Sequence, residues 1–235
     1  MKKITILIAC LSILISCTTT EFKPRIIEEP ETDDMQAMDD EDPPISAPVT
    51  APCENGLAGM FYSCSDYDLV YRLDLDDLDA SSGNDCWGWT DPDTGKEYAI
   101  MGLNNGTSFI DISDPLDIRI LGKLPTQTSN STWRDIKIYQ NHAYIVSEAD
   151  GHGMQVFDLT KLRNVQGTNN TFAIDNIYNG FGKAHNIVIN EESGYAYAVG
   201  TTSYNGGPHF VNIQVKWNRS DTEVTNSFGS FLARV

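Results

Sequence analysis

The chain has 235 residues, 40% of them hydrophobic and 21% charged, and a formal net charge of −17 at pH 7. This length fits one large β domain or two small ones. Binding to a nucleic-acid backbone is not expected, because phosphate contacts need clustered Lys and Arg, and Asp and Glu outnumber them by 33 to 16.

Residues 1–16 have the pattern of a lipoprotein signal peptide. Two lysines precede an apolar run over residues 4–15, which is too short to span a bilayer. The sequence LISC at 14–17 resembles the lipobox of bacterial lipoproteins, which predicts that Cys17 is lipidated and becomes the mature N-terminus. Acyl chains anchor a protein because each buried methylene contributes about 0.8 kcal/mol. Thr18, in place of a retention Asp, favours the outer membrane. An ordinary secretory signal is the alternative.

Residues 17–52 are predicted to be a disordered tether. This segment is rich in Asp, Glu and Pro, so its charges repel one another and it has too little apolar surface to offset the entropy of ordering. Its expected role is to lift a domain off the lipid surface. A calcium-binding acidic loop is the alternative, but the Gly and the ligand spacing of an EF-hand are missing.

Cys53 and Cys64 are expected to form a disulfide, because an exported protein meets an oxidising compartment. Cys86 is left over, and we expect it to be free and largely buried beside Trp87; the alternative is that it competes for the disulfide. The alternation of apolar and polar residues over 66–78 predicts a half-buried strand, followed by a loop at 80–84.

A repeated unit of strands occupies residues 53–214. Its clearest copies lie at 85–124, 133–172 and 185–214, and no long amphipathic helix is predicted among them. In each copy a Gly is followed five residues later by an acid or amide, and a Tyr lies in the strand before it. The step of about 50 residues is close to the length of one four-stranded propeller blade. The aligned residues are Tyr98, Tyr144 and Tyr197, and then Asp111, Asp158 and Asn212.

This pattern predicts an all-β fold of β-propeller-like blades with antiparallel strands. We count three full blades and a partial one before Asp85, whereas a closed propeller usually needs at least four. The prediction is therefore an open arc rather than a closed ring, with two exposed flanks that favour association. Residues 215–235 form a divergent tail. The hypothesis is a shortened product; a tail strand that closes an unusual small propeller is the alternative.

Whole phrases of the sequence resemble the choice-of-anchor B family, whose propellers consist of LVIVD repeats. The segments that carry the resemblance are 83–115, 131–165 and 180–202, and the similarity extends over about 53–214. The resemblance implies a bacterial cell-surface or secreted propeller, here anchored through Cys17, and implies no particular reaction. The chain departs from the family at Cys86, where a small polar residue is usual, and after Gln214, where further blades are usual.

Candidate axial residues begin the predicted innermost strands. His185 begins one, and Arg134 and Asp135 begin the strand of the preceding copy. Imidazole nitrogen suits Zn, Cu or Fe, so a divalent metal is one interpretation and a hydrogen-bonded channel or rim histidine is the other. The remaining histidines, His142, His152 and His209, are predicted to lie at the surface.

No catalytic residue is predicted, because the G-x-S-x-G elbow of hydrolases is absent. Asp111, Asp158 and Asn212 are expected to accept backbone hydrogen bonds in turns. The sequence therefore favours a lipid-anchored, cell-surface binding or scaffolding module for an unknown protein or glycan, since loops on a rigid frame carry recognition. The alternative is a cell-envelope metalloenzyme whose axial site, containing His185, is completed by blades that this chain lacks.

Overall fold

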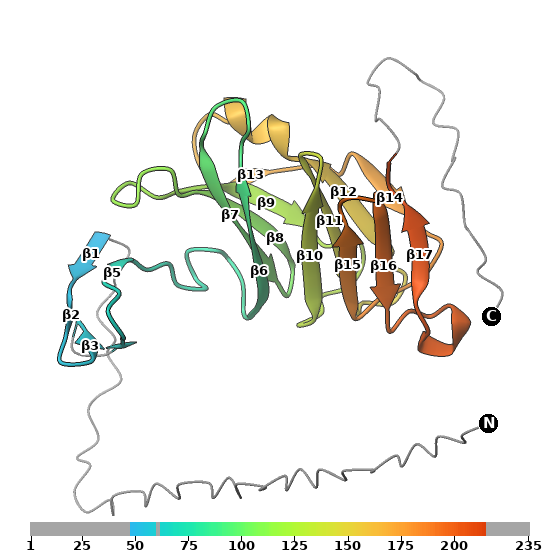
Figure 1. Cartoon of the computed structure of the whole chain (residues 1–235), viewed down its shortest axis with the longest axis horizontal. Helices are drawn as coiled ribbons and strands as arrows, with labels where there is room; N and C mark the ends of the chain where they lie inside the picture. The colour runs from blue at the N-terminus through green and yellow to red at the C-terminus, as the bar shows by residue number, and fades with distance from the viewer. Residues whose placement is uncertain (1–47, 60–61, 215–235) are drawn as a thin grey trace, which may run out of the picture. The chain divides into compact units, whose positions relative to one another are not determined.

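The structure is a computed structural model that describes residues 48–59 and 62–214 (Figure 1). The predicted signal peptide, the predicted lipidation site Cys17, most of the predicted tether and the tail 215–235 lie outside these residues. All described residues belong to one compact unit. Within them the fold is all-β, as predicted, and no sheet closes into a barrel. None of their helices has the length and apolar character needed to cross a membrane.

Blade 1 is an antiparallel sheet in the order β6-β7-β8-β9. Burial alternates along β7 between buried and partly buried residues, which is the period of two expected of a strand. Its strands are β6 (Gly83–Thr90), β7 (Glu97–Leu103), β8 (Gly106–Asp111) and β9 (Arg119–Pro125).

Blades 2 and 3 repeat this meander. Blade 2 has four strands: β10 (Arg134–Tyr139), β11 (His142–Ser147), β12 (Met154–Asp158) and β14 (Asn176–Tyr178). Blade 3 has three described strands: β15 (Asn186–Asn190), β16 (Tyr195–Val199) and β17 (His209–Asn212). The only helical segments among the described residues are two 3-10 turns, η1 (Leu159–Asn164) and η2 (Tyr204–Gly206). The predicted absence of a long helix is thus confirmed for this part of the chain.

A segment after η1 returns to blade 1 and ties the two blades together. The short strand β13 (Asn170–Thr171) pairs in parallel with β9, with Asn170 opposite Gly122. A Cβ atom at position 122 would lie 2.2 Å from the carbonyl oxygen of Asn170, and the φ angle there is +156°. Only glycine permits this approach, so the link between the blades depends on Gly122.

The strand register corrects one alignment made from the sequence. Tyr98 lies opposite Asp111, whereas the residues opposite Asp158 and Asn212 are His142 and Tyr195. Tyr98 is therefore equivalent to those two residues and not to Tyr144 and Tyr197. Side chains two positions apart share a face of a strand, so a sequence pattern alone does not distinguish the two phases.

Two apolar clusters join neighbouring blades. Ile100 and Phe109 of blade 1 pack with Ile136 and Phe157 of blade 2. Tyr144 and Val156, on the other face of blade 2, pack with Ile187 and Val211 of blade 3. Each blade thus contributes one face to each neighbour, and β10 lies between β6 and β15 (Figure 1).

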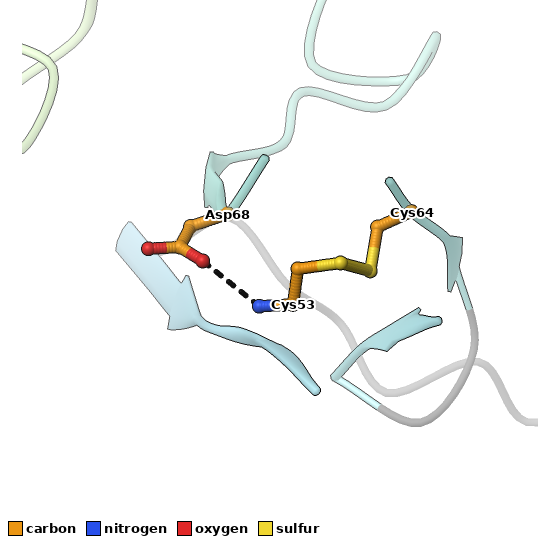
Figure 2. Close-up of a disulfide and its surroundings, with 3 residues drawn as sticks. All are labelled: Cys53, Cys64 and Asp68. Atoms are coloured by element: carbon orange, nitrogen blue, oxygen red, sulfur yellow. Dashed lines mark hydrogen bonds between the residues drawn. A yellow bond between two sulfur atoms is a disulfide. The ribbon is translucent and has the colours of Figure 1, made fainter. Parts of the chain in front are cut away.

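The chain before blade 1 forms two small sheets. One contains β1 (Pro48–Ala51) and β5 (Leu69–Tyr71), and the other contains β2 (Cys53–Glu54), β3 (Leu57–Ala58) and β4 (Tyr62–Ser63). The expected disulfide between Cys53 and Cys64 is present, with Cα atoms 5.8 Å apart (Figure 2). Asp68 Oδ1 accepts a hydrogen bond from the backbone N–H of Cys53 at 2.8 Å.

The strand predicted over 66–78 is wrong beyond β5. The backbone turns at 75–79, where the N–H groups of Leu78 and Ala80 both donate to Leu75 O. Leu73, Leu78 and Ala80 then pack on the face of blade 1 that points away from blade 2. The prediction of two exposed flanks is therefore corrected at this end, because the chain itself covers part of that face.

Cys86 is free, as expected, but it is exposed rather than buried. It occupies the position on β6 that Ile136 has on β10 and Ile187 has on β15, as the strand pairings show. Those isoleucines are fully buried because a preceding blade covers them. Among the described residues, no blade precedes β6.

Candidate functional site

The innermost strands of the three blades are joined by one type of contact. Asp85 Oδ2 on β6 accepts a hydrogen bond from the backbone N–H of Ile136 on β10, at 2.8 Å. Asp135 Oδ2 on β10 accepts one from the N–H of Ile187 on β15, at 2.6 Å. Asn186 occupies the third equivalent position, and its Nδ2 donates to Asp135 Oδ2 at 3.3 Å. The predicted site residue Asp135 therefore connects blades 2 and 3.

Lys137 lies between the two aspartates. Its Nζ is 2.5 Å from Asp135 Oδ1 and 3.8 Å from Asp85 Oδ2, and it also donates to Ile136 O at 2.8 Å. The ammonium group stands 4.4 Å from the centre of the Trp87 ring, within the range of a cation–π contact. One cation thus neutralises much of a carboxylate pair at the inner strands.

The two aspartates differ in acidity. Burial and a hydrogen bond with Asp135 raise the pKa of the Asp85 carboxyl. Burial also acts to raise the pKa of Asp135, but hydrogen bonds from Lys137 and Ile187 outweigh it and lower the pKa. Such a separation is found in acid–base pairs and in structural ion networks alike. Here both oxygens of Asp135 accept hydrogen bonds from neighbouring groups, which favours the structural role.

Arg134, the second predicted residue, is 1% exposed and lies between blades 1 and 2. Its Nε donates to Leu103 O and its Nη2 to Thr126 Oγ1, both at 3.0 Å. Its Nη1 is 3.0 Å from His152 Nε2. Burial lowers the pKa of Arg134 to about 10. Within the described part of the chain no carboxylate pairs with this guanidinium, so neutral acceptors hold it.

His152 is fully buried, which corrects its predicted surface position. Its Nδ1 lies 3.1 Å from Gly153 O, so Nδ1 carries the proton and Nε2 accepts from Arg134. Burial and the neighbouring Arg134 charge lower the pKa of His152 to about 4. His209 is also buried, at 5% exposure, and its Nε2 lies 2.6 Å from the hydroxyl of Tyr178. Of the three histidines predicted to lie at the surface, His142 alone is partly exposed.

His185, the remaining axial candidate, lies in a different environment. Its side chain is 52% exposed, and its Nδ1 is 2.5 Å from Glu148 Oε1. Its ring lies 6.2 Å from that of Trp133, measured between centroids. His185 thus contacts Glu148 and Trp133, whereas Asp135 contacts Lys137, Asn186 and Ile187. No three metal-binding side chains come together anywhere in residues 48–59 and 62–214.

The recurring acid or amide of each blade has the predicted structural role. Asp111 Oδ1 accepts from Ser113 N at 3.1 Å, Asp158 Oδ1 from Thr160 N at 2.9 Å, and Asn212 Oδ1 from Gln214 N at 3.0 Å. Each closes a turn over two residues, as Asp and Asn side chains do at the ends of strands. This prediction is confirmed in all three blades.

A cavity of about 540 Å³, lined by both polar and apolar residues, lies beside blade 1. Its walls come from the turn at 76–79, from β9 and from residues 169–171. The polar side chains that line it include Asp76, Asp77, Asn105, Lys123, Asn170 and Thr171. Lys123 Nζ donates to Asp79 O at 2.7 Å and to Asn105 Oδ1 at 3.2 Å, and burial lowers the pKa of Lys123.

The sequence did not indicate this cavity, because residues 76–78 were predicted to belong to a strand. It also missed Asp85, Lys137 and the buried partner His152. A sequence signal for Asp85 was available, since Asp85 and Asp135 occupy equivalent positions of two repeats. The burial of His152 had no such signal. No protein-family model matches the chain, and no curated protein gives a significant match.

Proposed function

We propose that this chain is a lipid-anchored, cell-surface binding or scaffolding module of the choice-of-anchor B type. The observation that supports it best is the cavity beside blade 1, with its polar side chains. Its volume of about 540 Å³ falls within the roughly 300–1,000 Å³ of ligand sites. The blades behind it are fixed by the Asp85 and Asp135 contacts, so the cavity walls stand on a rigid frame.

The lining favours a hydroxyl-rich ligand such as a glycan. Carboxylates and carboxamides offer acceptors and donors that can pair with neighbouring hydroxyl groups. Asp76 and Thr171 contribute exposed side chains to the wall, whereas Lys123 is already held by Asp79 and Asn105. A polar protein loop is the other ligand that this lining suits.

The proposal is tested with the full chain on a glycan array, followed by titration of the best ligand. Asp76→Ala removes a carboxylate from the cavity wall and should weaken binding at least tenfold. Asp117→Ala removes an exposed carboxylate of blade 1 outside the cavity and should leave binding unchanged. The absence of any glycan binding, or equal binding by the Asp76→Ala variant, would overturn the proposed glycan site.

Attachment to the membrane is a part of the proposal that rests on the sequence. Lipidation of Cys17 would place the module at the outer membrane or cell surface, with residues 18–47 as a spacer; the predicted tether ends earlier than expected, because residues 48–51 form strand β1 and pair with β5. Surface access is measured by adding protease to intact cells, since only an outward-facing module would be cleaved.

A cell-envelope metalloenzyme remains the alternative proposal. It requires a ligand set that includes His185, and the described neighbours of His185 supply only Glu148 as a second ligand. Metal analysis of the purified full chain distinguishes the two functions. Stoichiometric metal that is lost in the His185→Ala variant would favour the enzyme, and unchanged behaviour of a metal-free protein would favour the binding module.

A further inference from the structure

One face of blade 3 has no covering blade among the described residues. Side chains alternate along its strands, so Ile187, Ala196, Ala198 and Val211 point toward blade 2 and are buried. The opposite side chains form what we call the outer face of blade 3: Asn186, Val188, Tyr195, Tyr197, Val199 and Phe210. Val188 is 58% exposed and Val199 37% exposed.

Equivalent faces elsewhere in the molecule are buried. Tyr197 pairs across the strands with Phe210, as Tyr144 pairs with Val156 in blade 2 and Ile100 with Phe109 in blade 1. The four residues of blades 1 and 2 are at most 1% exposed, because the next blade packs on them. The outer face of blade 3 therefore has the composition of an inter-blade interface. Its Tyr197 and Phe210 rings pack edge to face, with their centroids 5.2 Å apart.

This face differs from the others in charge. Blades 1 and 2 have Asp85 and Asp135 at the position that reaches the next blade, whereas blade 3 has Asn186. None of the outer-face residues carries a charge, although the chain has a net charge of −17. Two copies of so acidic a chain repel each other over most of their surface, so an uncharged apolar face is where they can meet.

The other end of the described blades does not offer an equal surface. Leu73 and Leu78 pack against the face of blade 1 that points away from blade 2. A head-to-tail contact between copies would have to displace these residues. A contact between two identical outer faces displaces nothing in the described part of the chain.

We propose that the outer face of blade 3 binds the same face of a second copy in a two-fold symmetric dimer. Such an interface is self-complementary and closes at two subunits. The Asn186 side chain, whose Nδ2 donates to Asp135 of the same chain, suits a two-fold axis because it is neutral, whereas an Asp there would bring two carboxylates together. Aromatic residues such as Tyr197 and Phe210 are enriched at the centres of protein interfaces.

Cross-linking of the full chain tests the contact directly. Val188→Cys is introduced into a Cys86→Ser background, and a mild oxidation catalyst is added to promote disulfide formation between copies. A dimer band on a non-reducing gel is expected. Leu116→Cys in the same background is the matched control, since Leu116 is 56% exposed on blade 1, and it should cross-link far less. The background without an added cysteine measures any contribution of Cys10 and Cys17.

Sedimentation velocity of the full chain tests the affinity. Val188→Asp places like charges on both copies and should raise the dimer dissociation constant at least tenfold, whereas the neutral Val188→Thr variant should remain dimeric. A monomeric wild type overturns the proposal. Slow maleimide labelling of Val188→Cys in that monomer would mean that another segment of the same chain covers the face. Fast labelling would mean that the face is open for a different protein.

Discussion

Asp135→Ala is the variant that tests the inter-blade contacts most directly. It removes the acceptor of the Ile187 N–H bond at 2.6 Å and the partner of Lys137 at 2.5 Å. Ile187 is fully buried, so its N–H group would lose its acceptor without gaining water. A hydrogen bond to a charged group contributes about 1.5–3 kcal/mol, and an unsatisfied buried donor costs a similar amount. We expect the free energy of unfolding to fall by about 3 kcal/mol.

Urea titration followed by tryptophan fluorescence measures this loss. The transition midpoint should fall with an unchanged slope, and the melting temperature should fall by roughly 6–12 °C for a domain of this size. Asp135→Asn is the matched control, because its amide oxygen still accepts from Ile187 N, and it should lose about 1 kcal/mol. A Asp135→Ala variant as stable as the wild type would refute the contact as a source of stability. If Asp135→Ala and Asp135→Asn lowered the free energy of unfolding equally, the stabilisation would come from the charge of Asp135 and not from the hydrogen bond to Ile187.

Four further predictions concern the pKa of His152, the Arg163–Asp91 ion pair, the cysteines of the folded domain and lipidation at Cys17. The folded pKa of His152, about 4 because of burial and Arg134, lies below its ordinary 6.5, so the unfolded chain takes up the proton first. Stability should therefore fall by about 3 kcal/mol as the pH drops from 6.5 to 4, and His152→Gln should flatten that part of a urea-titration profile; an unaltered slope would contradict this. Arg163 donates to both oxygens of Asp91 and lowers the pKa of the Asp91 carboxyl to about 2. The stability that this ion pair contributes should therefore be lost only as the pH falls from about 3.9 toward 2. Carbon-detected NMR should show the Asp91 pKa rising in Arg163→Met. Mass mapping should recover the joined Cys53 and Cys64 peptides, with Cys86 modified by maleimide in the folded protein; protection of Cys86 would argue against its exposed position. Cys17→Ser should abolish labelling by a fatty-acid analogue and release the protein from the membrane, and continued labelling would disprove lipidation there.

The blades could be predicted from the sequence because their signals are local. Alternation of apolar and polar residues defines a strand, and Gly, Asp and Asn define the turns between strands. Asp111, Asp158 and Asn212 accept hydrogen bonds from residues only two positions away, so a short stretch of sequence contains both partners. The disulfide also required only the two cysteines and the expected compartment.

Contacts between blades were decided by the tertiary structure. Asp135 reaches Ile187, and Arg163 reaches Asp91, across distances in the sequence that no local pattern encodes. The phase of Tyr98 was misassigned for a related reason, because register depends on the partner strand as well as on alternation.

Burial separated the candidate residues from one another. The sequence placed Arg134, Asp135 and His185 at one axial site, since all three begin inner strands. In the fold, packing of blade 1 on blade 2 buries Arg134 with His152, packing of blade 2 on blade 3 binds Asp135 to the next strand, and His185 stays at the exposed rim. The sequence by itself located the three blades and most of their strands, but it did not show that residues 170–171 pair with blade 1 or that residues 176–178 complete blade 2. Which of them are buried, paired or left exposed was decided by how the blades pack, because a side chain on an inner strand gains its neighbours from the adjoining blade.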